Sequence, residues 1–279
     1  MVESKFMNTL LYITWNVDPV AFAIGPVEVR WYGLLYAMGF VLGITLLAKM
    51  FKGEGVPEEW ADKVLIYTIV ATIVGARLGH VFFYDWAYYS QHLSEIFMVW
   101  KGGLASHGGV IAIFIALWLL CKYSFKKPLL WLGDRFMVPA VFVGAMIRLG
   151  NLMNSEIYGG PTTLPWGFKF LREYPAGTPL EMIPACHPTQ IYEAGSYLLL
   201  FIVLLCMYYF TDARKREGLI CGTAFALFFL IRFLLEFIKN DQVAFEADML
   251  LNMGQLLSIP FILLGLFFVI RSFCRPKQE

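Results

Sequence analysis

A set of polar and ionisable side chains stands out because its members fall inside, or at the ends of, otherwise apolar stretches. The set comprises Tyr32, Arg77, His107, Arg148, His187, Glu193, Arg232 and Glu236. Two or three arginines in a dry cavity form an anion clamp that suits a phosphate group. A histidine beside such a clamp could act as a general base near neutral pH. The residue types therefore predict a phosphate site, and in a membrane the obvious phosphate is a phospholipid headgroup.

The spacing of these residues brings some of them together. Arg232 and Glu236 are four residues apart, so they share one helix face and can pair or bracket a common ligand. Arg148 and Asn151 are three residues apart and also share a face. Asn154 is rotated off that face and is expected where the helix ends.

A histidine-proline pair marks another element start. Pro188 is suited to the first turn of a helix that begins after His187. Gln190 then falls three residues beyond that histidine. A purely structural interpretation of these residues also stays open: an ion pair that locks two helices, an interfacial histidine at 107 and a helix cap at 187.

The elements that carry these residues are predicted from composition and hydropathy. The chain has 279 residues, of which 59% are hydrophobic and 15% charged, whereas soluble domains are about 45–50% apolar and about 25% charged. Seven apolar runs predict seven transmembrane helices: 31–50, 64–84, 105–121, 136–154, 188–210, 218–238 and 249–270. We therefore expect an all-α polytopic membrane protein, with residues 1–279 in a single integral-membrane domain.

The distribution of basic residues predicts the orientation. Twelve lysines and arginines fall in the connections on the C-terminal side of the membrane and six on the other side, which places the N-terminus outside and the C-terminus inside. The polar set then lies in the outer half of the bundle. Asp134 and Arg135 are the exception, at the inner end, where we expect an interfacial pair. An arginine near the bilayer centre costs about 2.5–3.5 kcal/mol, so several retained arginines need a reason.

Two outer connections are long enough to have structure of their own. Residues 85–104 are rich in aromatics and predict an arm that lies on the outer membrane surface, and residues 155–187 predict a small ordered head. The net charge of +1 argues against a nucleic-acid partner. The five cysteines and four histidines show no metal-ligand spacing, so neither a metal nor a cofactor is expected.

Four longer motifs resemble those of bacterial prolipoprotein diacylglyceryl transferases. They are RLGNLMNSEIYG at 148–159, GGLASHGG at 102–109, HPTQIYE at 187–193 and RFLLEF at 232–237. Shorter matches are RWYGL at 30–34, GARLG at 75–79 and GQLLSIP at 254–260. The resemblance covers nearly the whole chain. It departs at His80, where many members have an aromatic residue, and it assigns no residue in 161–186.

The resemblance implies a seven-span enzyme of the bacterial plasma (inner) membrane with its active site towards the outer leaflet. Such enzymes move the diacylglyceryl group of phosphatidylglycerol to the lipobox cysteine of a prolipoprotein signal peptide, form a thioether and release glycerol phosphate. The family's essential histidine and arginines match His107, Arg148 and Arg232, which we predict to be catalytic. We assign to substrate binding Tyr32, Arg77, Asn151, Asn154, Glu156, His187, Gln190, Glu193 and Glu236.

The resulting hypothesis is that Arg148 and Arg232 hold the phosphate while His107 takes the thiol proton. The expected partners are phosphatidylglycerol, the precursor peptides and the surrounding membrane lipids, and a monomer is expected. Two alternatives stay open: a phospholipid transporter or scramblase that uses the same arginines without chemistry, and a structural protein in which the ion pairs only pack helices. The transporter predicts polar residues that continue to the inner leaflet, and the sequence shows few there.

Overall fold

The computed structural model describes residues 12–240 and 250–276, and the chain within these ranges is mostly helical. Seven helices there are long and apolar enough to cross a membrane: Trp31–Gly53, Glu59–Phe83, Ser106–Phe125, Leu129–Met153, Thr189–Phe210, Leu219–Glu236 and Met253–Phe273. Each corresponds to one predicted run, so the prediction of a seven-helix membrane protein is confirmed. The chain forms two compact units, a large unit of Met1–Gly43 with Met137–Glu279 and a small unit of Ile44–Phe136. The prediction of a single domain stays a prediction.

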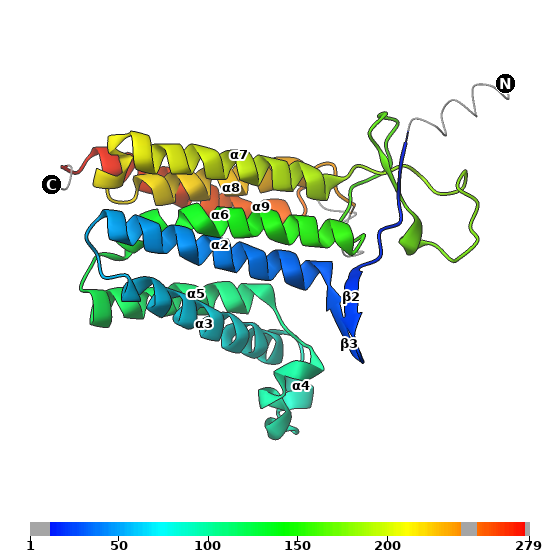
Figure 1. The fold of residues 1–279 in the computed structure, drawn as a ribbon, viewed down its shortest axis with the longest axis horizontal. Coiled ribbons are helices and arrows are strands. Elements are labelled where there is room, and N and C mark those ends of the chain that lie inside the picture. Colours follow the sequence, from blue (N-terminus) through cyan, green and yellow to red (C-terminus); the bar gives the residue numbers. More distant parts are fainter. Residues whose placement is uncertain (1–11, 241–249, 277–279) are drawn as a thin grey trace. The chain divides into compact units, whose positions relative to one another are not determined.

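The large unit consists mainly of neighbouring helices (Figure 1). It contains the start of α2 (Trp31–Gly53), most of α6 (Leu129–Met153), α7 (Thr189–Phe210), α8 (Leu219–Glu236) and α9 (Met253–Phe273). Helices α8 and α9 pack closely at Gly222 and Gly265, where an added Cβ would lie 2.7 Å from the backbone oxygen of the opposite glycine. Tyr197 of α7 stacks on Phe228 of α8, with ring centroids 4.2 Å apart.

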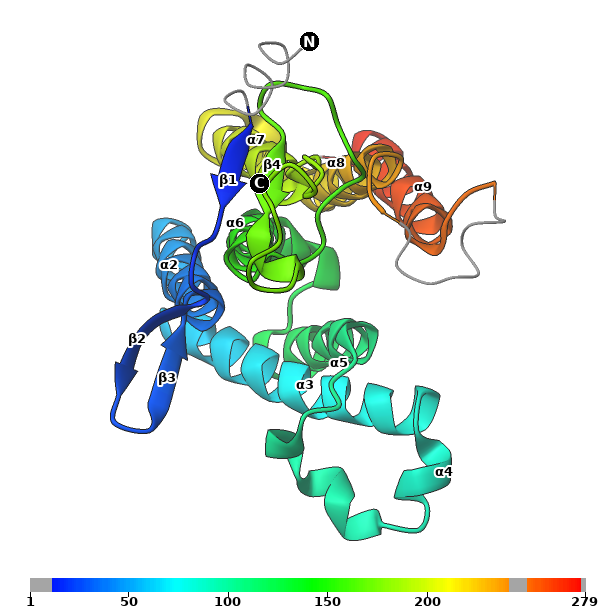
Figure 2. The ribbon, with the colours of Figure 1, turned by 90° about the vertical axis from the view of Figure 1, so that its right-hand side faces the viewer.

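Four short strands were not predicted, because each is too brief to give an alternating pattern. Strand β1 (Ile13–Trp15) pairs in parallel with β4 (Phe168–Phe170), and β2 (Val20–Ile24) forms an antiparallel hairpin with β3 (Val27–Arg30). Figure 2 shows β1 and β4 side by side. Their apolar side chains help to build a small core of Leu152, Phe168, Phe170 and Cys186, against which Trp15 and Tyr158 pack. This core joins residues of the segment 155–187 to the end of α6 and to β1.

The small unit is built on two closely packed helices, α3 (Glu59–Phe83) and α5 (Ser106–Leu119). Gly79 faces Gly108, and a Cβ on Gly79 would lie 2.8 Å from the Gly108 Cα, so only glycine permits this approach. A Cβ on Gly75 would meet the side chain of Ala112. The segment between the helices contains α4 (Trp86–Tyr89) and the 3₁₀ turns η1 (Leu93–Phe97) and η2 (Val99–Lys101). This helical segment is hereafter the arm.

Several span ends differ from the prediction, and two of these differences change where charged residues lie. The third was expected to end at 121, but α5 continues as the π-helical turn η3 (Leu120–Phe125). The fourth begins at Leu129 instead of 136, so Arg135 lies inside a helix. Its guanidinium binds Glu54, with Nη2 2.8 Å from Oε2. That partner is 81 positions away, so the spacing around Asp134 and Arg135 did not indicate it.

Candidate functional site

A continuous row of charged side chains lies in the large unit and joins α6 and α7 to the end of α8. The Nε atom of Arg148 is 2.8 Å from Oε2 of Glu193. The other oxygen of Glu193 is 3.0 Å from Nζ of Lys239, which in turn is 3.2 Å from Oε2 of Glu236. The Glu193 side chain is fully buried and that of Lys239 is 3% exposed. Buried charges are tolerated only when they compensate one another, and these do.

A second branch of this network runs from Arg148 towards the head. The Nη1 atom of Arg148 donates to Oδ1 of Asn151 at 3.2 Å, and Asn151 Nδ2 donates to Oε1 of Glu156 at 2.8 Å. Asn154 Nδ2 reaches the same oxygen at 3.2 Å. Ser155 and Ile157, the neighbours of Glu156, have positive φ angles of 58° and 60°, which is unfavourable for a β-branched residue. This strained turn directs Glu156 back to both amides.

Tyr32 joins the same cluster from the first turn of α2. Its ring packs on Gly150 of α6, where an added Cβ would lie 2.7 Å from the Tyr32 Cδ2 atom. The charges of Glu156 and Arg148 both act on its hydroxyl group. A glycine at 150 therefore allows the tyrosine to reach the network.

Arg232 differs from Arg148 in its bonding. It lies on α8 and is half-buried, and it makes neither a salt bridge nor a hydrogen bond with another residue in 12–240 or 250–276. Of the two options for Arg232 and Glu236, direct pairing is absent there, and Lys239 contacts the Glu236 carboxylate instead. The charges of Arg148 and Arg232 both act on the hydroxyl of Tyr197. The Arg232 fork is therefore available to a ligand.

Several buried polar atoms around this network lack a hydrogen-bond partner in the described part of the chain. They are Asn154 Oδ1, Ser155 Oγ, Gln190 Oε1 and Glu193 Oε2. Glu193 Oε2 is included because the Nε–H of Arg148, although close, is not aimed at it; the contact is an ion pair without an aligned hydrogen bond. Native proteins leave few such atoms, and a cluster of them indicates a place that water or a polar ligand completes.

Gln190 and His187 connect the network to the head. Gln190 Nε2 donates to the backbone oxygen of Glu156 at 2.8 Å, which holds the strained turn against α7. The His187 backbone exchanges hydrogen bonds with Gly159 and Gly160 at 2.8 and 3.0 Å. Its Nδ1 atom lies 3.5 Å from the Tyr192 hydroxyl. In the structure, both residues hold the segment that follows α6 in place through its backbone.

Arg77 belongs to the small unit and binds the arm. Its side chain is 2% exposed and donates to four backbone oxygens, those of Glu95, Ile96, Gly102 and Gly103. The guanidinium also lies over the ring of Tyr89, 4.8 Å from its centroid. All three nitrogens are thus engaged by the arm, which indicates a positioning role; the contact of Arg77 with substrate stays a prediction.

His107 also belongs to the small unit, at the second residue of α5, directly after the arm. The ring is exposed and lies between Phe83 and Tyr84, with 5.6 Å between centroids in both cases. Ala105, two residues earlier, donates its backbone N–H to the oxygen of Ala76 at 2.9 Å. The arm and α3 therefore fix the point from which the histidine projects. His80, which departs from the family pattern, packs against Gly103 of the arm.

Two members of the network were missed from the sequence. Lys239 was counted among the outer charges, although it is seven residues after Arg232 and three after Glu236, a spacing that places residues on one side of a helix. Tyr197 is four residues after Glu193 on α7 and was not recognised because its neighbours in the sequence are apolar. The spacing rules could have found both.

Burial changes the acidity of two groups in the head, outside the spans. Burial is the largest cause that raises the pKa of Tyr158, to about 12, and the nearby Glu173 adds to it. Burial also raises the pKa of the Cys186 thiol, which therefore stays protonated near neutral pH. A protonated thiol is a poor nucleophile, so Cys186 is a packing residue.

Comparison with known proteins shows the family to which the chain belongs. The family described as prolipoprotein diacylglyceryl transferase matches residues 19–271. Three relatives carry the name phosphatidylglycerol–prolipoprotein diacylglyceryl transferase. The protein from Porphyromonas gingivalis is 50% identical over 98% of this chain and 99% of its own length. Those from Tolumonas auensis (43% identical; 92% of this chain, 96% of the relative) and Chloroherpeton thalassium (42%; 98% and 99%) are similar over nearly their whole length. The chain belongs to the prolipoprotein diacylglyceryl transferase family.

Proposed function

We propose that this protein transfers the diacylglyceryl group of phosphatidylglycerol to the thiol of a lipobox cysteine in a prolipoprotein signal peptide. The cysteine sulfur attacks the glyceryl carbon, a carbon–sulfur bond forms, and the carbon–oxygen bond to the phosphate breaks. Glycerol phosphate leaves with the electron pair of that bond. The names of the full-length relatives support this reaction, and the network around Arg148 supplies a site that suits it.

The observation that carries the proposal is the pair of arginines beside unsatisfied polar atoms. Among the described residues Arg232 forms neither a salt bridge nor a hydrogen bond, and Glu193 and Asn151 orient the guanidinium of Arg148. The phosphate gains negative charge as the carbon–oxygen bond breaks. Fixed guanidinium groups therefore stabilise the transition state more than the bound lipid.

The thiol proton is assigned to His107. A thiol must become a thiolate to attack, and an imidazole is a suitable base near neutral pH. Replacing His107 with glutamine should preserve binding of phosphatidylglycerol and reduce transfer by at least about 100-fold. His92→Gln, in the same unit but on the arm, is the matched control and should transfer at nearly the normal rate. Full activity of the His107→Gln variant would contradict the assignment.

The same proposal includes the site's place in the bacterial inner membrane, towards the outer leaflet. Tyr32 and Glu193 lie near the starts of α2 and α7, whereas Arg148 and Glu236 lie near the ends of α6 and α8. Because successive spans alternate in direction, these positions all correspond to one membrane side. The excess of basic residues on the other side supports an N-terminus outside and a C-terminus inside. A C-terminal alkaline phosphatase fusion should be inactive in cells; an active fusion would contradict this orientation.

The direct test of function uses purified protein, phosphatidylglycerol and a synthetic lipobox peptide. We expect the peptide to gain the mass of one diacylglyceryl group, attached to its cysteine through a bond that resists base. A peptide with serine in place of that cysteine should stay unmodified. A protein that moves labelled lipids between leaflets of vesicles but leaves the cysteine peptide unchanged would instead be a scramblase.

A further inference from the structure

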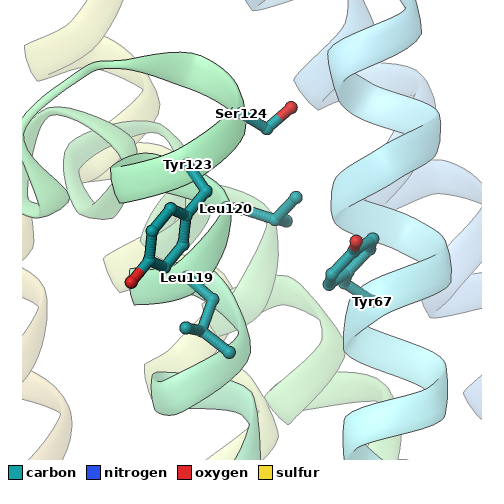
Figure 3. Close-up of a pocket in the computed structure, with 5 residues that line it drawn as sticks. All are labelled: Tyr67, Leu119, Leu120, Tyr123 and Ser124. Carbon is teal, nitrogen blue, oxygen red and sulfur yellow. The ribbon is translucent and has the colours of Figure 1, made fainter.

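The small unit has a pocket far along α3 and α5 from the arm, and none of the residues discussed so far line it. Figure 3 shows Tyr67 of α3 opposite Leu119, Leu120, Tyr123 and Ser124, which come from the end of α5 and from η3. The volume is about 370 Å³, which is within the range of ligand sites, about 300–1,000 Å³. Its lining is apolar along the leucines and polar at the hydroxyl groups of Tyr67, Tyr123 and Ser124.

The helix changes its winding at the pocket. The segment Leu120–Phe125 is π-helical, and it ends at Lys126, whose φ of 54° is left-handed. A π-helical turn has an extra residue per turn and occurs frequently at functional sites. Tyr123 and Ser124, which line the pocket, both lie in this turn.

Two lysines lie at the rim of this pocket, and neither has a carboxylate partner among the described residues. Lys63 Nζ is 3.5 Å from Ser124 Oγ, and Lys122 Nζ lies over the rings of Trp118 and Tyr123, 4.8 and 5.2 Å from their centroids. Neither ammonium group forms a salt bridge with any residue in 12–240 or 250–276, although Glu59 and Asp62 lie in the same part of α3. An anion bound between Lys63 and Lys122 would therefore be attracted by two ammonium groups that no carboxylate of the described chain neutralises.

We propose that this pocket binds one anionic phospholipid of the inner leaflet. The headgroup phosphate lies between Lys63, Lys122 and the Ser124 hydroxyl, and an acyl chain follows Leu119 and Leu120. Basic pockets between helices on the cytoplasmic side hold anionic headgroups in this way, and Trp118 and Tyr123 have the character of residues at the membrane interface. The membrane side rests on the orientation in the proposed function. No transfer chemistry occurs at this site.

The test compares lipid retention by the full-length protein and two matched double variants. Native mass spectrometry in a neutral detergent, with cardiolipin added, counts the lipids bound per protein. Lys63→Gln with Lys122→Gln should weaken cardiolipin binding by about tenfold or more, because each basic residue contributes to attraction of an anionic lipid. Lys49→Gln with Arg275→Gln removes the same charge elsewhere and should bind as the original protein does.

Three further comparisons decide the interpretation. Lys63→Arg with Lys122→Arg should restore retention, which shows that loss in the glutamine variant is not misfolding. Phosphatidylcholine should bind at least about tenfold more weakly than cardiolipin. Equal cardiolipin retention by the glutamine variant, or equal binding of the two lipids, would overturn the proposal. The same preparations are assayed for diacylglyceryl transfer, which the glutamine variant should retain; a protein that binds the lipid but never transfers would refute only the enzyme function.

Discussion

The arginines of the two compact units have similar sequence surroundings and different bonding. In the small unit, Arg77 gives its whole fork to backbone oxygens of the arm, and Arg135 gives its fork to Glu54. In the large unit, Arg148 is partly engaged and Arg232 has no partner in the described chain. An arginine whose donors are all used holds structure, whereas one with free donors beside unsatisfied atoms is prepared for a ligand. Burial follows the same division: Arg77 and Arg135 are buried, whereas Arg148 and Arg232 are partly exposed.

The largest effect is expected from a substitution that breaks the row of charged side chains in the large unit. Replacing Glu193 with glutamine leaves Arg148 and Lys239 without their shared, fully buried carboxylate. Breaking a buried pair costs about 3–5 kcal/mol, so the free energy of unfolding in detergent should fall by that order. Chemical denaturation followed by tryptophan fluorescence measures it. Glu181→Gln, on the exposed head surface, is the control; similar stability of both variants would mean that the row carries no structural energy.

A smaller and local effect is expected in the small unit. Arg77→Lys keeps the charge, but an ammonium group cannot reach four oxygens that surround a planar fork. We expect the arm to open more easily by about 2–3 kcal/mol, seen as faster hydrogen exchange of the amides in 93–103 with little change in the middle of α5. Arg30→Lys, on an exposed residue, should leave the arm as it is. Unchanged exchange in the Arg77→Lys variant would remove the distinction between the two units.

The helices and most residues of the site could be predicted from the sequence, because hydropathy and the cost of placing a charge in a membrane depend on the local sequence. The seven spans were predicted, and the family motifs contain Arg148, Glu193 and Arg232. The bonding was not predictable in the same way. Whether Glu236 pairs with Arg232 or with Lys239 depends on how the chain turns after α8, and Arg135 finds Glu54 through folding of distant segments.

The backbone contacts of Arg77 could not be predicted from the sequence either. Its position near the outer end of a span resembled that of Arg148, so a contact with substrate was the natural hypothesis. Its four acceptors are backbone oxygens, which every residue has, and no side-chain pattern marks them. The short strands were missed for a similar reason: three residues of β1 pair with a segment more than 150 positions away.

The smallest effect concerns the thiol in the head. Because burial raises the pKa of Cys186, the folded protein holds this proton more strongly than the unfolded chain. Its contribution to stability is complete below the unfolded pKa of the thiol and is lost as the pH rises through the folded pKa. Alkylation of Cys186 by iodoacetamide at pH 8 should be much slower in the folded protein than in denaturant. Equal rates would show that the head core is open.

Matched Arg→Lys variants test most directly whether Arg232 of the large unit binds substrate while Arg135 of the small unit stabilises the fold. The measurement is the rate of diacylglyceryl transfer to a lipobox peptide, together with the melting temperature of each variant. Arg232→Lys should reduce the rate by about 100-fold or more at an unchanged melting temperature, because this arginine has no hydrogen-bond or salt-bridge partner among residues 12–240 and 250–276. Arg135→Lys should lower the melting temperature while the folded fraction transfers within a few-fold of normal. Near-normal transfer by Arg232→Lys, with a loss of stability, would contradict the account.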